Sequence, residues 1–398
     1  MTSDTGHDPR FDEIVDRRGT NSSKWDGMEA LFGVSPDDGL SMWVADKDFR
    51  APETIRKALA DYAASGVYGY AHSDQALREA TAWWMQQRHG WTIDPKHVLS
   101  ANGMVNAIAL AIDAFSEPGD GVVIFTPVYH AFRRVILASE RDVIDCPMRI
   151  EDGRHVMDFE AYNHLIPAHT RLLILCSPHN PGGQVWRPDE LRALAAFAAR
   201  HNLIILSDEI HHDLVYSGQT HTPLPLAAPD VLDRLIMLTA TTKTFNIAGA
   251  HIAQAIIPDE ALRRRFDQRR IGLATKPGAL SLLVAEAAYS PECAEWVDGL
   301  MDYLDGNRQL FDDGLNAIPG VRSMPLEATY LSWVDFTDTG MDRAELTRRV
   351  REQARIAASP GESFGTQSET WLRFNIGMPR AHIVEAIARL QSAFSDLQ

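Results

Sequence analysis

Four short, continuously apolar segments constrain the fold of this chain more than any other feature of its sequence. They are GVVIFTP, RLLILCSP, NLIILSDE and RLIMLTA, at residues 121–127, 171–178, 202–209 and 234–240. Strands that are buried on both faces have such unbroken apolar runs, and strands of parallel sheets are buried in this way. Because helical patterns separate these runs, the sequence predicts an α/β fold with a mostly parallel sheet between layers of helices.

The distribution of these patterns predicts three parts of the chain. Residues 50–290 alternate helix and strand and are expected to form a large α/β domain. Residues 291–398 contain a long helical pattern that begins with proline, two short strands and two further helices, which predicts a smaller α+β domain. Residues 1–49 have no evident core of their own, so we expect them to pack on the small domain and the functional site.

Composition argues against several classes of function. A formal net charge of −16 at pH 7, without any basic run, argues against binding to nucleic acid. No segment has the roughly 18 consecutive apolar residues of a membrane span, and the N-terminus lacks the apolar core of a signal peptide. Cys146, Cys176 and Cys293 are far apart in the sequence and are expected to be reduced thiols of a cytoplasmic protein. No histidine spacing typical of a metal site is present, so no metal is predicted.

Polar residues follow the predicted strands at the edge where ligands bind in open α/β sheets. The side chains gathered there are those of Tyr129, Asn180, Asp208, His211 and Lys243. A carboxylate, an amine, two hydrogen-bonding groups and an aromatic ring would suit a planar, pyridine-like electrophile with a phenolic oxygen. Each residue alone also has a simpler interpretation, as a helix cap, a turn or a solvated surface group. Their joint occurrence at successive strand ends favours a functional site.

Several motifs of this chain resemble those of a known enzyme family. SPHNPGG, SDEIH, TTKTFNIAG and WLRFNIG are similar to motifs of the pyridoxal-phosphate (PLP) enzymes of fold type I, aminotransferase class I/II. Within that family, RRGTNSSKWDGMEALFG, MWVADKDF, GVYGY and EPGDGVVIFTPVYHAF resemble the MalY/PatB-type cystathionine β-lyase branch. The likeness extends from about Thr20 to Arg380. It implies a large domain whose mostly parallel sheet has seven strands, with PLP as the cofactor.

The resemblance implies roles for the residues at the strand ends. Lys243 matches the lysine that binds the cofactor covalently and then removes the proton from the substrate Cα. Asp208 matches the carboxylate that pairs with the pyridine nitrogen, and both residues are predicted to be catalytic. Asn180 and His211 match the residues that bind the phenolic oxygen. Tyr129 matches the aromatic ring that stacks on the cofactor.

The cofactor phosphate is expected to lie at a helix N-terminus. Gly103 and Met104 precede that helix, which is expected to start near Val105 and whose backbone N–H groups suit a dianion. Thr242 matches a hydroxyl donor of the family. Tyr70 resembles a tyrosine that reaches the phosphate from the neighbouring subunit, which implies a homodimer with shared active sites and adds Tyr70 to the predicted catalytic residues. His251 stands where many family members carry a phosphate-binding arginine, so its role is left open.

Three residues are implied in substrate binding. Arg373 matches the arginine that holds the α-carboxylate, a natural bidentate pairing, with Asn180 beside it. The backbone near Ala45 is expected to face the same carboxylate. Lys47 departs from the ADMDF pattern that is usual in the branch. We expect its side chain to point to solvent, with an effect on specificity as the alternative.

The leading prediction for activity is a C–S β-lyase that acts on cystathionine or a related S-substituted cysteine. After loss of the Cα proton a thiolate would leave from Cβ, and the products would be a thiol, pyruvate and ammonia. An aminotransferase of class I/II, built from the same residues, is the alternative. A regulatory protein that binds a transcription factor is a third, and no sequence feature favours it.

Overall fold

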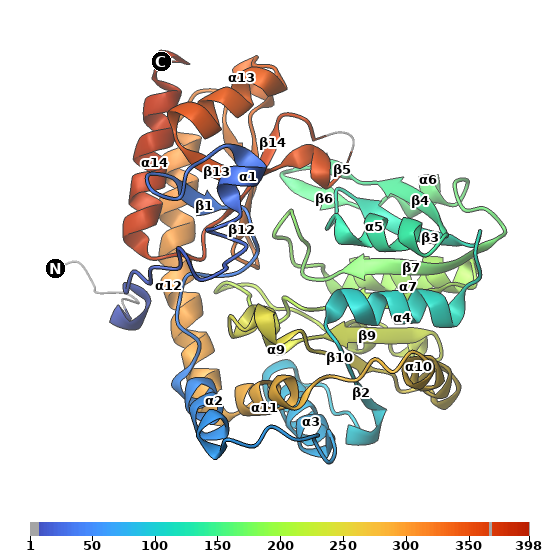
Figure 1. Ribbon diagram of the computed structural model, residues 1–398. Helices are drawn as coiled ribbons and strands as arrows, with labels where there is room; N and C mark the ends of the chain where they lie inside the picture. The colour runs from blue at the N-terminus through green and yellow to red at the C-terminus, as the bar shows by residue number, and fades with distance from the viewer. Residues whose placement is uncertain (1–7, 366–367, 398) are drawn as a thin grey trace.

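The computed structural model of the chain describes residues 8–365 and 368–397, and it contains the seven-stranded sheet that the resemblance implied (Figure 1). The neighbouring strands β9, β8, β7, β3 and β4 are parallel, whereas β10 is antiparallel to both β2 and β9. The predicted mostly parallel α/β fold is therefore confirmed. In sheet order the strands are β2 (Val98–Ala101), β10 (Ala253–Ile256), β9 (Leu235–Thr239), β8 (Ile204–Asp208), β7 (Thr170–Cys176), β3 (Gly121–Thr126) and β4 (Asp142–Pro147).

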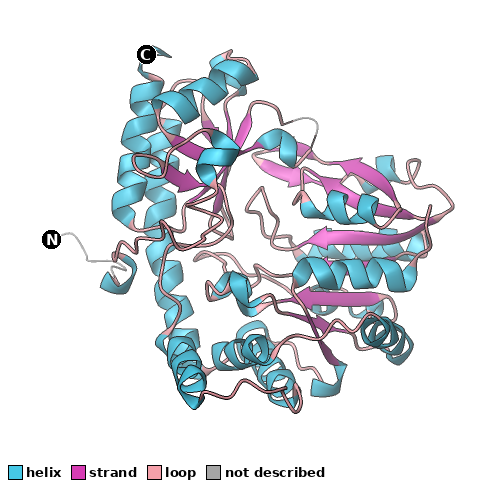
Figure 2. Cartoon of the chain, in the orientation of Figure 1, coloured by secondary structure: helices cyan, strands magenta, loops and turns pink. Residues whose placement is uncertain are grey.

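Helices cover both faces of this sheet (Figure 2). Successive side chains of a strand point to opposite faces, and β7 shows the result. Leu172 and Ile174 belong to the hydrophobic cluster under α4 (Met104–Phe115), α5 (Ala131–Ala138) and α10 (Glu260–Gly272). Leu173 and Leu175 belong to the opposite cluster, which includes residues of α3 (Gln75–His89), α6 (Phe159–Tyr162), α7 (Pro188–Arg200) and α8 (Leu224–Ala227). Burial on both faces is the reason for the unbroken apolar runs in the sequence.

A second sheet of five strands lies beside the large one (Figure 1). It joins the two ends of the chain, because β1 from the N-terminal segment pairs in parallel with β13. In sheet order the strands are β1 (Leu40–Met42), β13 (Ile356–Pro360), β14 (Trp371–Asn375), β12 (Leu331–Asp335) and β11 (Arg322–Ser323). Three helices accompany them, namely α12 (Pro291–Asn316), α13 (Arg343–Arg348) and α14 (Arg380–Ala393).

The long helix α12 begins as the sequence predicts. The hydroxyl of Ser290 accepts a hydrogen bond from the N–H of Cys293, and Pro291 occupies the first turn, where no N–H is needed. The apolar side of α12 packs against α14 in the core of the small sheet. The exact division into residues 1–49, 50–290 and 291–398 stays a prediction.

Helices and strands outside these two sheets and their covering helices connect the layers.

None of the described helices combines the length and apolar character that crossing a membrane requires. Cys146, Cys176 and Cys293 are free and buried, as expected of reduced thiols. Besides short 3-10 turns and a π-helical turn after α13, the other elements are α1 (Met28–Phe32), α2 (Glu53–Ser65), β5 (Arg149–Glu151), β6 (Arg154–Val156), α9 (Thr241–Thr244) and α11 (Ala279–Ala288).

Candidate active site

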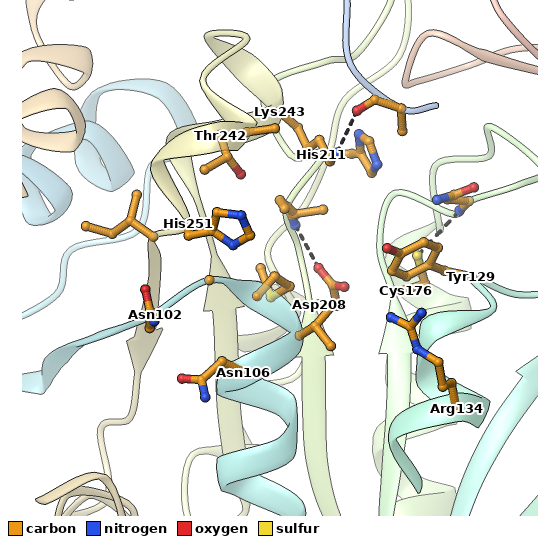
Figure 3. Close-up of a pocket in the computed structure, with 18 residues that line it drawn as sticks. Asn102, Asn106, Tyr129, Arg134, Cys176, Asp208, His211, Thr242, Lys243 and His251 are labelled. Carbon is orange, nitrogen blue, oxygen red and sulfur yellow. Dashed lines mark hydrogen bonds between the residues drawn. The ribbon is translucent and has the colours of Figure 1, made fainter. Parts of the chain in front are cut away.

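A cavity of about 450 Å³ lies at the carboxyl ends of β7, β8 and β9, in front of the N-terminus of α4 (Figure 3). All the residues predicted from the strand ends, and several that only the resemblance implied, line this one cavity. They are Ala45, Gly103, Met104, Tyr129, Asn180, Asp208, His211, Thr242 and Lys243. Arg373 contacts one of them, whereas Tyr70 is not among the lining residues of its own chain.

Lys243 lies on the short helix α9, which follows β9 directly. Its Nζ points into the cavity and donates a hydrogen bond to the carbonyl oxygen of Ala45, 2.5 Å away (Figure 3). Loss of hydration at this depth lowers the pKa of Lys243 to about 8. A lysine amine with such a pKa is partly neutral near physiological pH, so it can act as a nucleophile or a base.

Asp208 ends β8 and presents its carboxylate to the cavity (Figure 3). Its Oδ1 accepts a hydrogen bond from the N–H of Ile210 at 3.2 Å, and no cation of the described residues lies within ion-pair distance. Burial raises the pKa of Asp208 to about 7. A ligand with a positively charged ring N–H beside Asp208 would favour the ionised carboxylate.

Arg373 on β14 of the small sheet contacts the lining residue Asn180 and is almost fully buried. One terminal nitrogen donates to Oδ1 of Asn180 at 2.9 Å, and the other donates to the carbonyl oxygen of Trp43 at 2.7 Å. Its Nε has no hydrogen-bond partner among the described residues, and the same is true of Nδ1 of His211. Unsatisfied buried polar atoms are uncommon, and His211 lines the cavity, where a polar ligand could supply a partner.

The N-terminus of α4 forms the opposite end of the cavity. Gly103 caps this helix with a φ of 94°, in the left-handed region that glycine adopts without strain. The leading N–H groups of α4 have no partner within the helix itself, and Thr242 and His251 line the same cavity. This end suits an anion such as a phosphate.

Lys47 lies differently from its prediction. Its side chain is fully buried, so the expectation that it points to solvent is wrong. Its Nζ donates to the carbonyl oxygens of Lys243 at 2.5 Å and Thr244 at 3.2 Å. These partners lie almost 200 residues away in the sequence, which is why no local pattern reveals them.

A second buried group supports α9 and was not identified from the sequence. Oδ2 of Asp213 accepts a hydrogen bond from the hydroxyl of Thr244 at 2.8 Å. Oδ1 of Asp213 accepts from Nε1 of Trp84 at 2.9 Å and lies 2.8 Å from Nε2 of His89, while His212 contacts Oδ2 at 3.2 Å. Ligand atoms of His89, His212 and Asp213 lie within 4.8 Å of one another, a grouping that the sequence spacing did not reveal. Because hydrogen bonds occupy both carboxylate oxygens, we interpret this group as a support for the turn next to Lys243.

Comparisons with known proteins agree with this geometry. Residues 44–390 match the model of the family "Aminotransferase class I and II". The chain is 38% identical to cystathionine β-lyase PatB of Bacillus subtilis, over 97% of this chain and 100% of that protein. It is 33% identical to protein MalY of Escherichia coli, over 96% and 98% of the two chains.

Solved structures show the same relationship. The crystal structure of cystalysin from Treponema denticola, which contains a pyridoxal 5'-phosphate cofactor, superposes with a TM-score of 0.92 at 32% identity, covering 98% of this chain and 99% of that chain. The resemblance inferred from the sequence motifs is thus confirmed, and the chain belongs to the aminotransferase class I and II family.

Proposed function

We propose that this protein is a PLP-dependent C–S β-lyase that cleaves L-cystathionine or a related S-substituted cysteine to a thiol, pyruvate and ammonia. The observation that carries the proposal is the Lys243 amine, whose pKa is lowered to about 8, in one cavity with Asp208 and close to Arg373. The names of the relatives PatB and cystathionine β-lyase support the same reaction.

The donors and acceptors of the cavity fit pyridoxal phosphate. The phosphate would bind at Gly103, Met104 and Thr242, at the N-terminus of α4. Asp208 would accept a hydrogen bond from the pyridine nitrogen, and the free Nδ1 of His211 faces the same cavity. The ring oxygen would bind Asn180 and His211, the ring would stack on Tyr129, and Lys243 would hold the cofactor covalently.

Residues of the chain then have separate tasks in the reaction. Bound pyridoxal phosphate supplies an electron sink that stabilises negative charge at the substrate Cα. Arg373, held by Asn180 and Trp43, would bind the α-carboxylate and orient the Cα–H bond. The neutral amine of Lys243 would take the Cα proton, after which a thiolate can leave from Cβ. The carbonyl oxygen of Ala45, which accepts from Nζ, would hold the amine in place.

We further propose a cytoplasmic homodimer. Tyr70 is completely exposed and follows the exposed Val67 and Tyr68, so an apolar segment lies open on the surface of the single chain. A second copy that covers this segment would bury it and bring Tyr70 of one copy to the phosphate site of the other. Tyr70 would then act in catalysis through the cofactor phosphate.

An assay with cystathionine tests the proposed reaction. Purified protein supplied with pyridoxal phosphate is expected to release pyruvate and a free thiol from L-cystathionine without any added keto acid. A reaction that requires a keto acid and consumes it in equal amount would instead identify an aminotransferase and contradict the lyase proposal.

Arg373→Lys is expected to raise KM for the amino-acid substrate about 10- to 100-fold, because lysine keeps the charge but cannot bind a carboxylate with two parallel hydrogen bonds. Steady-state kinetics measure the change. Arg322→Lys is the matched control, since Arg322 lies in the same sheet but is exposed and pairs with Asp338 at 2.9 Å. An unchanged KM in Arg373→Lys would contradict the assigned role.

A further inference from the structure

Lys47 is an unusual buried cation next to the active-site lysine. It follows β1 in the N-terminal segment, and its side chain has no solvent exposure. Its Nζ contacts the carbonyl oxygens of Lys243 and Thr244, and it lies 4.7 Å from the centre of the Tyr330 ring. Two carbonyl oxygens and an aromatic face all attract a positive charge.

These contacts correspond to the end of a helix. The N–H groups of Phe245 and Ile247 donate to the carbonyl oxygens of Thr241 and Thr242. At the carboxyl end of α9, the carbonyl oxygens of Lys243 and Thr244 are therefore left for Lys47, within the described part of the chain. A cation at that end is favoured by its hydrogen bonds to these carbonyl oxygens. Lys47 therefore fixes the turn that carries Lys243.

The neighbouring carboxylates are occupied by other cations. Asp46 forms a two-point pair with Arg17, at 3.1 and 3.0 Å. Asp48 pairs with Lys24 at 2.7 Å and with Arg17 at 2.8 Å. Within residues 8–365 and 368–397, no carboxylate lies within ion-pair distance of Lys47, so its charge acts on the cavity without a direct counterion.

We propose that Lys47 is a positioning residue for Lys243, whose ammonium group fixes the carboxyl end of α9 and, as a second positive charge beside the cavity, favours the neutral amine of Lys243. This role depends on Lys243 acting as the base, as proposed above.

Other charged and titratable groups also face the two lysines. Burial, and then the charge of Lys243, lower the pKa of Lys47 well below its ordinary value, so the two amines oppose each other's protonation. The two carbonyl oxygens and the Tyr330 ring act in the opposite direction, because hydrogen bonds and an aromatic face favour the ammonium form of Lys47. The groups that act on Lys243 or Lys47 from the surrounding elements are Lys24, Asp46, Asp208, His211 and Arg373.

Lys47→Met tests the electrostatic part of this role. Methionine is unbranched, has a similar length and suits a fully buried position, so the variant is expected to fold. In the cofactor-bound protein, the long-wavelength absorbance changes with pH as the Lys243 nitrogen titrates. The midpoint of that change is expected to rise by at least about 0.5 pH unit, because a positive charge that opposed protonation is gone.

A second variant and a surface control separate charge from packing. Lys47→Gln keeps an N–H donor for the carbonyl oxygens but removes the charge, and the same rise is expected. Lys57→Met removes an exposed charge on α2 and is expected to leave the midpoint unchanged. A midpoint within about 0.2 pH unit of wild type in either folded Lys47 variant would overturn the proposal.

The test remains informative without the cofactor. In the cofactor-free full-length protein, the pH dependence of Lys243 acetylation by acetic anhydride can be followed by peptide mass spectrometry. Its midpoint is also expected to rise by at least about 0.5 pH unit in Lys47→Met. If wild-type protein shows no protein-bound absorbance after pyridoxal phosphate is added and the excess removed, the proposed function is refuted. An unchanged acetylation midpoint in Lys47→Met would refute only the role of Lys47.

Discussion

Lys243→Ala is expected to reduce turnover of cystathionine at least about 10⁴-fold, the largest effect of any single substitution in this chain. The variant removes the residue that is proposed to attach the cofactor covalently and to take the Cα proton. Lys47 cannot replace the lost amine, because its Nζ is held by the carbonyl oxygens of residues 243 and 244. Turnover is measured as pyruvate released, and borohydride treatment shows in parallel whether cofactor is still attached to the protein.

Lys57→Ala provides the control for loss of a lysine, since Lys57 is exposed and pairs with Asp61 at 2.5 Å on α2. Its turnover is expected to equal that of wild type. If Lys243→Ala kept turnover within about tenfold of wild type, another group would have to be the base. Full biological function of an inactive Lys243→Ala variant would instead favour the regulatory alternative.

Asp213→Ala is expected to lower the free energy of unfolding by about 3–5 kcal/mol, because it removes the acceptor at the centre of a buried network. Trp84 Nε1 and the hydroxyl of Thr244 would lose their partner, and both are buried where water cannot replace it. Urea denaturation measures the loss. Since Thr244 is adjacent to Lys243, a weaker affinity for pyridoxal phosphate is expected as well.

Asp298→Ala is the matched control. Asp298 is an exposed carboxylate on α12 that pairs with Arg88 at 2.7 Å, and exposed pairs contribute only about 0–1 kcal/mol. Equal losses in Asp213→Ala and Asp298→Ala would show that the buried network has no special weight.

The same carboxylate predicts a pH dependence of stability. Burial alone would raise the pKa of Asp213, but contacts with His212 and His89 lower it well below the ordinary value of about 3.9. A depressed folded-state pKa contributes stability that is present above the unfolded-state pKa and lost as pH falls through the folded-state value. The difference between wild type and Asp213→Ala is therefore expected to be full at neutral pH and to shrink only below about pH 4.

The sequence was most informative where burial is uniform. β3, β7, β8 and β9 were predicted because both faces of each strand are covered, so each strand contains a continuous apolar run. β4 lies at the edge of the sheet and is half exposed, and its sequence DVIDCP has no continuous apolar run. Such a strand becomes recognisable only from its pairing with β3.

The residues of the candidate site also fall into those that the sequence identifies and those that only the structure reveals. Asp208 and Lys243 were identified because each follows a recognisable strand, and adjacent parallel strands bring their carboxyl ends together. The environment of Lys47 and the network of Asp213 depend on contacts between distant segments, and no local signal encodes them. Residue type and spacing therefore indicate which groups meet at a sheet edge, whereas the groups that support them from behind require the tertiary structure.

The pairing of β1 with β13 has a consequence for synthesis of the protein. Trp43, which follows β1, offers its carbonyl oxygen to Arg373 on β14, so the end of the cavity that is proposed to bind the carboxylate needs both segments in place. A nascent chain still attached to the ribosome cannot form this contact until β14 has emerged. A variant that lacks β1 and Trp43 is expected to lose this support for Arg373, even with the large sheet fully formed.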